Sequence, residues 1–210
     1  MNETRGEISM STTDTIDETA GTEMRSVGLF EQIRQDYERH GRMVLDAAFI
    51  SLCVYRYGRW GLHRRHAVAR RIASKTYGFL NLFVANITKI WIPPQVTVGE
   101  GFHIVHAEGS LSIHPGVVIG KRLGVMHNVT IGTNMGDGVP TIGDDVFIGV
   151  NSTVLGNIKI GDRVRIAANT AVTTNVPSDS VVVGSPAKIY PRLMALRLGG
   201  ADKTASETKA

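Results

Sequence analysis

Two of the seven histidines, His106 and His127, follow aliphatic residues of a repeating pattern by the same interval. His106 stands two positions after Ile104, and His127 stands two positions after Val125. A neutral imidazole with an ordinary pKa of about 6.5 can take a proton from a hydroxyl group at cellular pH. Two imidazoles held close together disfavour double protonation, so at least one stays basic. We therefore expect a general base here, although from the residues alone both histidines could also be ordinary polar corner residues.

The repeating pattern is a ladder of aliphatic residues spaced by six, often followed by a small residue. An α-helix of period 3.6 cannot keep such a ladder on one face, whereas a triangular coil of short flat strands can. One aliphatic side chain per strand points inward, and stacked coils bury a continuous column. We predict a left-handed parallel β-helix of about four coils, so the fold is mainly β. The inward positions are Ile92, Val98, Ile104, Ile113, Ile119, Val125, Ile131, Ile142, Ile148, Val154, Ile160, Ile166 and Val172.

Two insertions interrupt the ladder. Three extra residues separate Ile104 from Ile113, and five more form a loop at about 133–140. If the first insertion follows His106, then His106 and His127 share one corner of adjacent coils, about 4.8 Å apart at the backbone. Loops on a repeat scaffold often carry function, and we expect this one to lie beside the two histidines.

The remaining histidines look structural. We expect His103 and His114 to point outward, since each adjoins an inward position, and His40, His63 and His66 to lie on helix surfaces. Because the corner offers no third ligand at matched spacing and no cysteine partner, we expect no metal site.

Upstream of the ladder the sequence changes character. We expect a disordered tail at 1–24, rich in Ser, Thr and Glu, and an α-helical segment at 25–90 with breaks at Gly41 and Gly58. The β-helix domain should occupy 91–192, followed by a tail at 193–210.

Charge and cysteine content narrow the possible environments. The formal net charge is +4, and the segment from Arg56 to Lys75 holds seven basic residues and no acid. Such a run suits a solvated helix face, phosphate groups, nucleic acid or an anionic membrane surface; we expect no nucleic-acid partner. The single cysteine, Cys53, is expected to be core filler. Neither a signal peptide nor an apolar segment long enough to span a bilayer is seen, so we expect a soluble, cytoplasmic protein.

Three segments resemble a known family: VYRYGRW at 54–60, HIVHAEG at 103–109 and VVVGSPAKIYPR at 181–192. They are similar to hexapeptide-repeat acyltransferases, and most similar to the serine acetyltransferase group. The resemblance implies a homotrimer with active sites between neighbouring prisms, acetyl-CoA as co-substrate, and His106 as the base for direct attack on the thioester. It implies cofactor contacts at Val150, Ala168, Thr173, Thr174 and Lys188. From their charge, we expect Lys188 and Arg192 to meet the CoA phosphates.

The sequence also departs from that group. Trp91 stands where the family has an aspartate that pairs with the catalytic histidine, and Val105 replaces a second aspartate. Gly138 and Val139 replace an Arg-His pair. An upstream Asp-Pro is replaced by His40 and Gly41. Charged hydrogen bonds contribute about 1.5–3 kcal/mol each, so these losses argue against free serine.

Glu108 and Asp137 are candidates to orient the catalytic histidine. The aromatic Trp91, expected near the site, would suit stacking against a sugar ring. The leading expectation is therefore an acetyl-CoA-dependent O-acetyltransferase acting on a sugar, glycan precursor or other small metabolite, with His127 assisting His106. The alternatives are a serine O-acetyltransferase of cysteine biosynthesis and a non-catalytic trimeric scaffold. Peripheral membrane contact through the basic helix is a further possibility.

Overall fold

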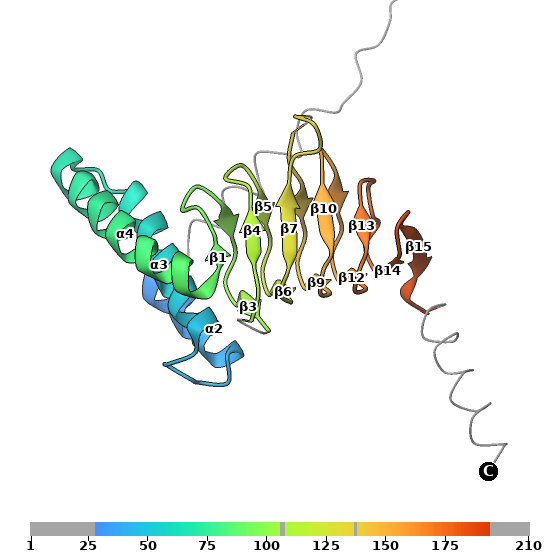
Figure 1. Cartoon of the computed structure of the whole chain (residues 1–210), viewed down its shortest axis with the longest axis horizontal. Coiled ribbons are helices and arrows are strands. Elements are labelled where there is room, and N and C mark those ends of the chain that lie inside the picture. The colour runs from blue at the N-terminus through green and yellow to red at the C-terminus, as the bar shows by residue number, and fades with distance from the viewer. Residues whose placement is uncertain (1–27, 106–107, 137, 194–210) are drawn as a thin grey trace, which may run out of the picture.

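The computed structural model describes residues 28–105, 108–136 and 138–193. The tail expected at 1–24, all but the first residue of that at 193–210, and the candidates His106 and Asp137 lie outside the described residues. Three helices come first: α2 (Leu29–Arg39), α3 (Ala47–Leu62) and α4 (Ala67–Thr88). Short strands then wind into a prism, and the helices lie at its N-terminal end (Figure 1).

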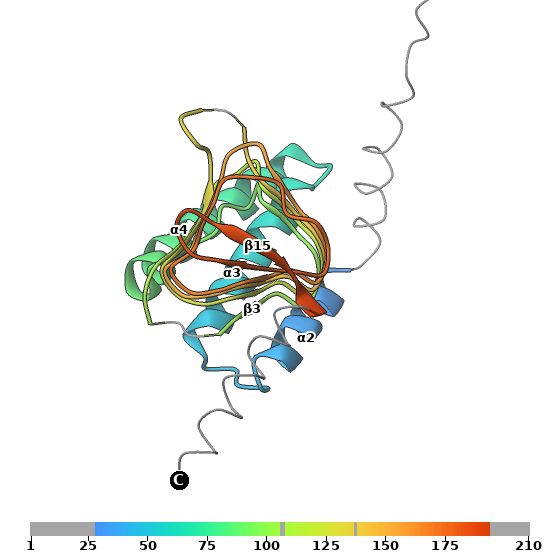
Figure 2. The ribbon, with the colours of Figure 1, turned by 90° about the vertical axis from the view of Figure 1, so that its right-hand side faces the viewer.

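The described strands form three sheets, which are the three sides of the prism seen end-on in Figure 2. Sheet A holds β1 (Ile90–Trp91), β4 (Leu111–Ile113), β7 (Val129–Gly132), β10 (Thr153–Leu155) and β13 (Ala171–Val172). Sheet B holds β2 (Thr97–Val98), β5 (Val118–Ile119), β8 (Thr141–Ile142) and β11 (Lys159–Ile160). Sheet C holds β3 (His103–Ile104), β6 (Gly124–Val125), β9 (Phe147–Ile148), β12 (Arg165–Ile166), β14 (Ser180–Val183) and β15 (Lys188–Pro191).

The chain visits sheets A, B and C in turn, so the parallel pairs join strands three apart in sequence, except β12 and β14, between which the pass along sheet B is the isolated bridge Ile160–Val176. Among the described strands, only the closing β14–β15 pair is antiparallel. Every position of the predicted aliphatic ladder is buried, with at most 4% of its surface exposed. The predicted parallel β-helix of about four coils is therefore confirmed.

Stacked glycines form the corner between sheets B and C. A Cβ on Gly99 would come within 2.8 Å of the Gly120 carbonyl, and one on Gly120 within 2.7 Å of the Gly143 carbonyl carbon. Real side chains do not make such contacts, so this corner requires glycine, which explains the small residue that follows the aliphatic residues of sheet B.

The helices also pack through glycines. A Cβ on Gly58 would lie 2.4 Å from the Tyr77 ring, and one on Gly61 would lie 2.7 Å from the Ala73 Cβ, so both glycines let α3 approach α4 closely. The predicted helix break at Gly58 is wrong, because that glycine serves helix packing. The predicted break at Gly41 is confirmed, with φ of 64° just after α2.

A buried ion pair joins the helices to the first coil. Arg56 donates to Asp36 at 2.9 Å, and both side chains are almost fully buried. Arg56 also donates to the carbonyls of Val98 at 2.8 Å and Gly99 at 2.6 Å, while the Phe102 N–H donates to Asp36 at 2.8 Å. The basic segment beginning at Arg56 is therefore not a single solvated face, because its first member is a buried anchor.

Candidate active site

His127 belongs to the edge where the chain passes from sheet C to sheet A, called here the C–A edge. Ile104 pairs with Val125, Val125 with Ile148, and Ile148 with Ile166. His127, Val150 and Ala168 stand two residues after Val125, Ile148 and Ile166, respectively. They therefore share one column, as predicted. His106 is two residues beyond Ile104 in the sequence, but it lies outside the described residues.

A ladder of asparagines fixes this edge. Asn128 donates to Asn151 at 3.1 Å, and Asn151 donates to Asn169 at 3.2 Å. All three have φ between 56° and 58°, the left-handed conformation that asparagine tolerates better than most residues. The side-chain ladder therefore holds successive coils in register one residue beyond His127.

The segment after the undescribed residues lies directly on His127. A Cβ on Gly109 would be 3.0 Å from the His127 Cβ, and Gly109 has φ of 132°. The neighbouring Ser110 N–H donates to the Asn128 side chain at 3.0 Å. Gly109 and Ser110 therefore lie at the C–A edge against the second coil, and Glu108, immediately before Gly109, is exposed.

The loop at 133–140 is not beside His127, contrary to the sequence-based expectation. It follows β7 of sheet A, so it belongs to the edge between sheets A and B, called here the A–B edge. Figure 2 shows it projecting from a different corner of the prism than the one that follows β3. Gly138 lies against Asn157, and the Val139 side chain contacts Gly116 and packs on the core.

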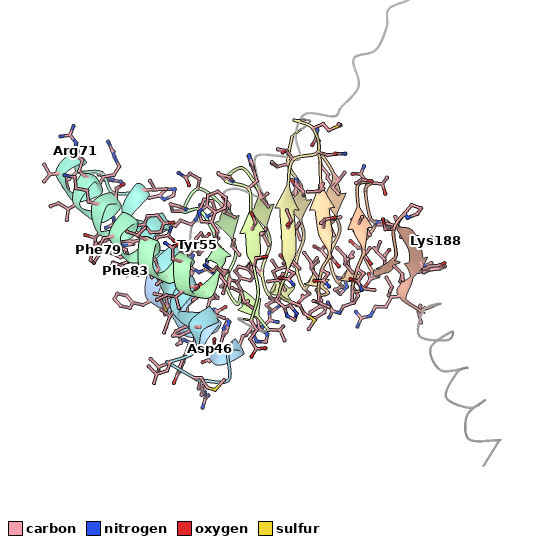
Figure 3. All side chains as sticks on the ribbon, viewed as in Figure 1. Asp46, Tyr55, Arg71, Phe79, Phe83 and Lys188 are labelled. Carbon is pink, nitrogen blue, oxygen red and sulfur yellow. The ribbon has the colours of Figure 1, made fainter. Side chains whose placement is uncertain are left out.

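The other candidates are distributed over the prism. Trp91, 48% exposed, lies on sheet A opposite Ser112. Thr173 and Thr174 are exposed at the A–B edge, one strand away from Val150 and Ala168. Lys188 lies on β15 at the far end of the prism (Figure 3), and the Arg192 N–H donates to the Asp179 carbonyl at 2.8 Å nearby. The structure therefore does not gather the candidates for cofactor contact at one edge of a single chain.

His40 was expected on a helix surface, and that expectation is wrong. Its ring is buried at the end of α2, with Nδ1 2.6 Å from the Asp36 carbonyl, while the Ile104 N–H donates to Nε2 at 3.3 Å. A carbonyl only accepts, so Nδ1 carries the proton and Nε2 is the acceptor. The His103 ring meets His40 edge-on at 4.8 Å between centroids. The only indication of this burial in the sequence was that His40 stands four residues after Asp36, at the end of a helix.

Away from the candidate site, His114 is exposed, as predicted. Burial raises the pKa of the Cys53 thiol to about 11, which disfavours a nucleophilic thiolate. Within 28–105, 108–136 and 138–193, no group of three or more metal-binding side chains is found. Of the helices described, none combines the length and apolar composition needed to cross a bilayer.

The comparisons with known proteins agree with this architecture. Residues 140–174 match the model of the family described as bacterial transferase hexapeptide (six repeats). Serine acetyltransferase 4 of Arabidopsis thaliana is 40% identical over 109 residues, which are 50% of this chain and 30% of that protein.

Two solved structures bear on the site. A serine acetyltransferase of Brucella abortus in complex with coenzyme A has a TM-score of 0.63 at 25% identity, covering 78% of this chain and 66% of that one. The Neisseria gonorrhoeae enzyme in complex with serine has a TM-score of 0.62 at 26% identity, covering 76% and 68%.

The repeat, the three-sided prism and the family match define a hexapeptide-repeat protein with a left-handed parallel β-helix. Within that class the chain is similar to serine acetyltransferases. The chain spans 30% of the length of the Arabidopsis relative.

Proposed function

We propose that this chain is an O-acetyltransferase that uses acetyl-CoA and acts on serine. The proposal rests on the pairing of Ile104 with Val125, because each of these residues stands two positions before a candidate histidine in the sequence, His106 and His127. The serine acetyltransferase relatives support serine as the acceptor, and the coenzyme A complex of the Brucella protein supports the acyl donor.

The proposed reaction is a direct transfer. His106 takes the proton of the acceptor hydroxyl, and the oxygen attacks the thioester carbon. The carbon–sulfur bond then breaks, and the CoA sulfur leaves and takes a proton. No enzyme nucleophile is required, which fits a chain whose one cysteine has a raised pKa. His127 assists by binding the acceptor or by sharing the role of base.

We propose that a homotrimer completes the site. In one chain the C–A edge with His127 and the A–B edge with the 133–140 loop are separated by sheet A. Packing the C–A edge of one copy against the A–B edge of the next would bring the two together. Acetyl-CoA would then lie in the groove between them, with Val150 and Ala168 on one side and Thr173 and Thr174 on the other. Lys188 and Arg192 are proposed to meet its phosphates.

A sugar or other hydroxyl compound is the second candidate acceptor, and two observations favour it. Val139 is apolar and packs on the core, so it provides no charge to bind an acceptor. The half-exposed Trp91 offers a flat apolar surface. A zwitterion needs charged partners, whereas a sugar ring is often held by an aromatic face. Glu108 and Asp137 are proposed to orient the histidine or bind this acceptor.

An acceptor screen tests the proposal. Free thiol released from acetyl-CoA would be measured with L-serine and with a panel of sugars, using the full chain. Serine-dependent release supports the serine reading, and release with a sugar but not with serine would replace it by the second candidate. If no acceptor gives release and calorimetry detects no CoA binding, the non-catalytic scaffold is favoured instead.

A further inference from the structure

Helix α4 carries a stripe of apolar side chains that no other part of the described chain covers. Val68, Ile72, Phe79 and Phe83 recur at intervals of four, seven and four, which places them on one side of the helix. The opposite side, with Ala73 and Tyr77, packs against α3. Figure 3 shows Phe79 and Phe83 on the outer side of α4, away from the β-helix. The exposed apolar residues of α4 are Val68, Ile72, Phe79, Leu80, Leu82, Phe83 and Ile87.

The degree of exposure is high for residues of this size. Phe79 and Phe83 are 64% and 53% exposed, and Ile87 is 78% exposed. Single exposed apolar residues are ordinary on protein surfaces, but a contiguous apolar stripe marks an interaction surface. Trp60, at the end of α3, adds a partly exposed aromatic ring on which the Arg64 guanidinium stacks at 4.0 Å.

The surroundings of the stripe are strongly basic. From Ala47 to Gly99 the sequence contains no aspartate or glutamate. Arg65, Arg70, Arg71 and Lys75 are exposed beside the stripe or at the N-terminal end of α4, and Arg71 lies near that free end in Figure 3. Apolar side chains flanked by arginine and lysine, with no acid between them, are typical of helices that lie in the plane of a membrane surface.

We propose that α4 and the end of α3 dock on an anionic lipid surface. The apolar stripe enters the boundary between headgroups and acyl chains, and the basic side chains contact the headgroup phosphates. A second copy of this chain fits the surface less well, because joining two such faces would bring like charges together. Nucleic acid would use the arginines but leave the phenylalanines in water. The proposal is independent of the acetyl-transfer reaction.

Co-sedimentation of the full chain with vesicles tests this proposal. We expect binding to vesicles of phosphatidylcholine mixed with phosphatidylglycerol, weakening at high salt, and little binding to phosphatidylcholine alone. Each basic residue near an anionic surface contributes substantially, so Arg70→Gln/Arg71→Gln should weaken vesicle binding by about tenfold or more. Phe79→Ser/Phe83→Ser should weaken it by a similar factor.

Two variants serve as matched controls. Phe30→Ser removes an 87% exposed phenylalanine from α2, and Arg122→Gln/Arg163→Gln removes two exposed cations from the β-helix. Both should bind vesicles like the parent chain. Circular dichroism checks that every variant is folded, and ultracentrifugation without lipid records the oligomeric state.

Four results would overturn the proposal. The first three are equal binding to neutral and anionic vesicles, equal loss of binding in the control variants, and unchanged binding after the α4 substitutions. A fourth is dissociation of an oligomer when Phe79 and Phe83 are replaced, because the stripe would then be a protein–protein interface.

Discussion

The backbone of Gly109 lies against the side chain of His127, so close that a Cβ on Gly109 would sit 3.0 Å from the His127 Cβ. Gly109 also has φ of 132°, a conformation open to glycine but strained for other residues. The contact joins the segment that leads into β4 to the second coil, at the edge that carries His127.

Replacing Gly109 by alanine should therefore damage both stability and activity. We expect a loss of about 1–3 kcal/mol from backbone strain, and a lower kcat/KM because His127 must shift. Gly101→Ala is the control, since Gly101 also has positive φ, at 70°, but a Cβ there would come closest to the flexible side chains of Arg39 and Arg122, at another edge. Thermal melts and thiol release would be compared. Equal loss of kcat/KM in the two variants would show that the contact with His127 has no special role.

The Asp36–Arg56 pair should dominate the attachment of the helices to the prism. Asp36→Ala leaves the Arg56 charge buried without its partner, and we expect a loss of about 3–5 kcal/mol in the free energy of unfolding, measured in urea. The double variant Asp36→Leu/Arg56→Met should recover part of the loss. Glu31→Ala, which breaks an exposed ion pair with Arg34 on the same helix, should leave stability nearly unchanged. An equally small effect of Asp36→Ala would contradict this account.

We expect His40 to stabilise the fold through its hydrogen bond with the Ile104 N–H. His40→Phe leaves the Ile104 N–H buried without an acceptor, which should cost about 1–3 kcal/mol. His63 is a matched control, because it also follows a helix and contacts the carbonyl four residues earlier, at 2.8 Å, but is exposed. Urea titrations of His40→Phe and His63→Phe would be compared, and we expect only the first to be destabilised. If both variants had the free energy of unfolding of the parent chain, the stabilising role of His40 would be refuted.

Cys53 should be slow to react and dispensable. Because burial raises its pKa to about 11, little thiolate is present near neutral pH, and labelling by a disulfide reagent should accelerate as the pH approaches that value. Cys53→Ala should retain acetyl transfer. Rapid labelling at neutral pH, or loss of turnover in the folded variant, would contradict the reading of Cys53 as packing.

Much of the β-helix could be predicted from the sequence, because one inward residue per strand imposes a six-residue period. The column of His127, Val150 and Ala168 follows from the same count. The error over the loop arose because consecutive strands face three different directions. His127 and the loop are one strand apart in sequence, yet that step moves the chain from one edge to the next.

Side-chain partnerships across the helices could not be predicted in the same way. Nothing in the local sequence distinguishes Arg56, buried against Asp36, from the exposed Arg70 and Arg71. Glycine often marks a helix break, but Gly58 lies within α3, where its missing side chain leaves room for the ring of Tyr77. These features depend on which elements meet, which the period of the repeat does not encode.

The most direct test of the central claim is thiol release from acetyl-CoA by His106→Ala, with the preferred acceptor found in the screen. A general base contributes about 10²–10⁴-fold, so we predict a fall in kcat of that size, with CoA binding by calorimetry and the melting temperature unchanged. His127→Ala should reduce turnover less. Turnover by His106→Ala within about tenfold of the parent chain, below the contribution of a general base, would contradict the account.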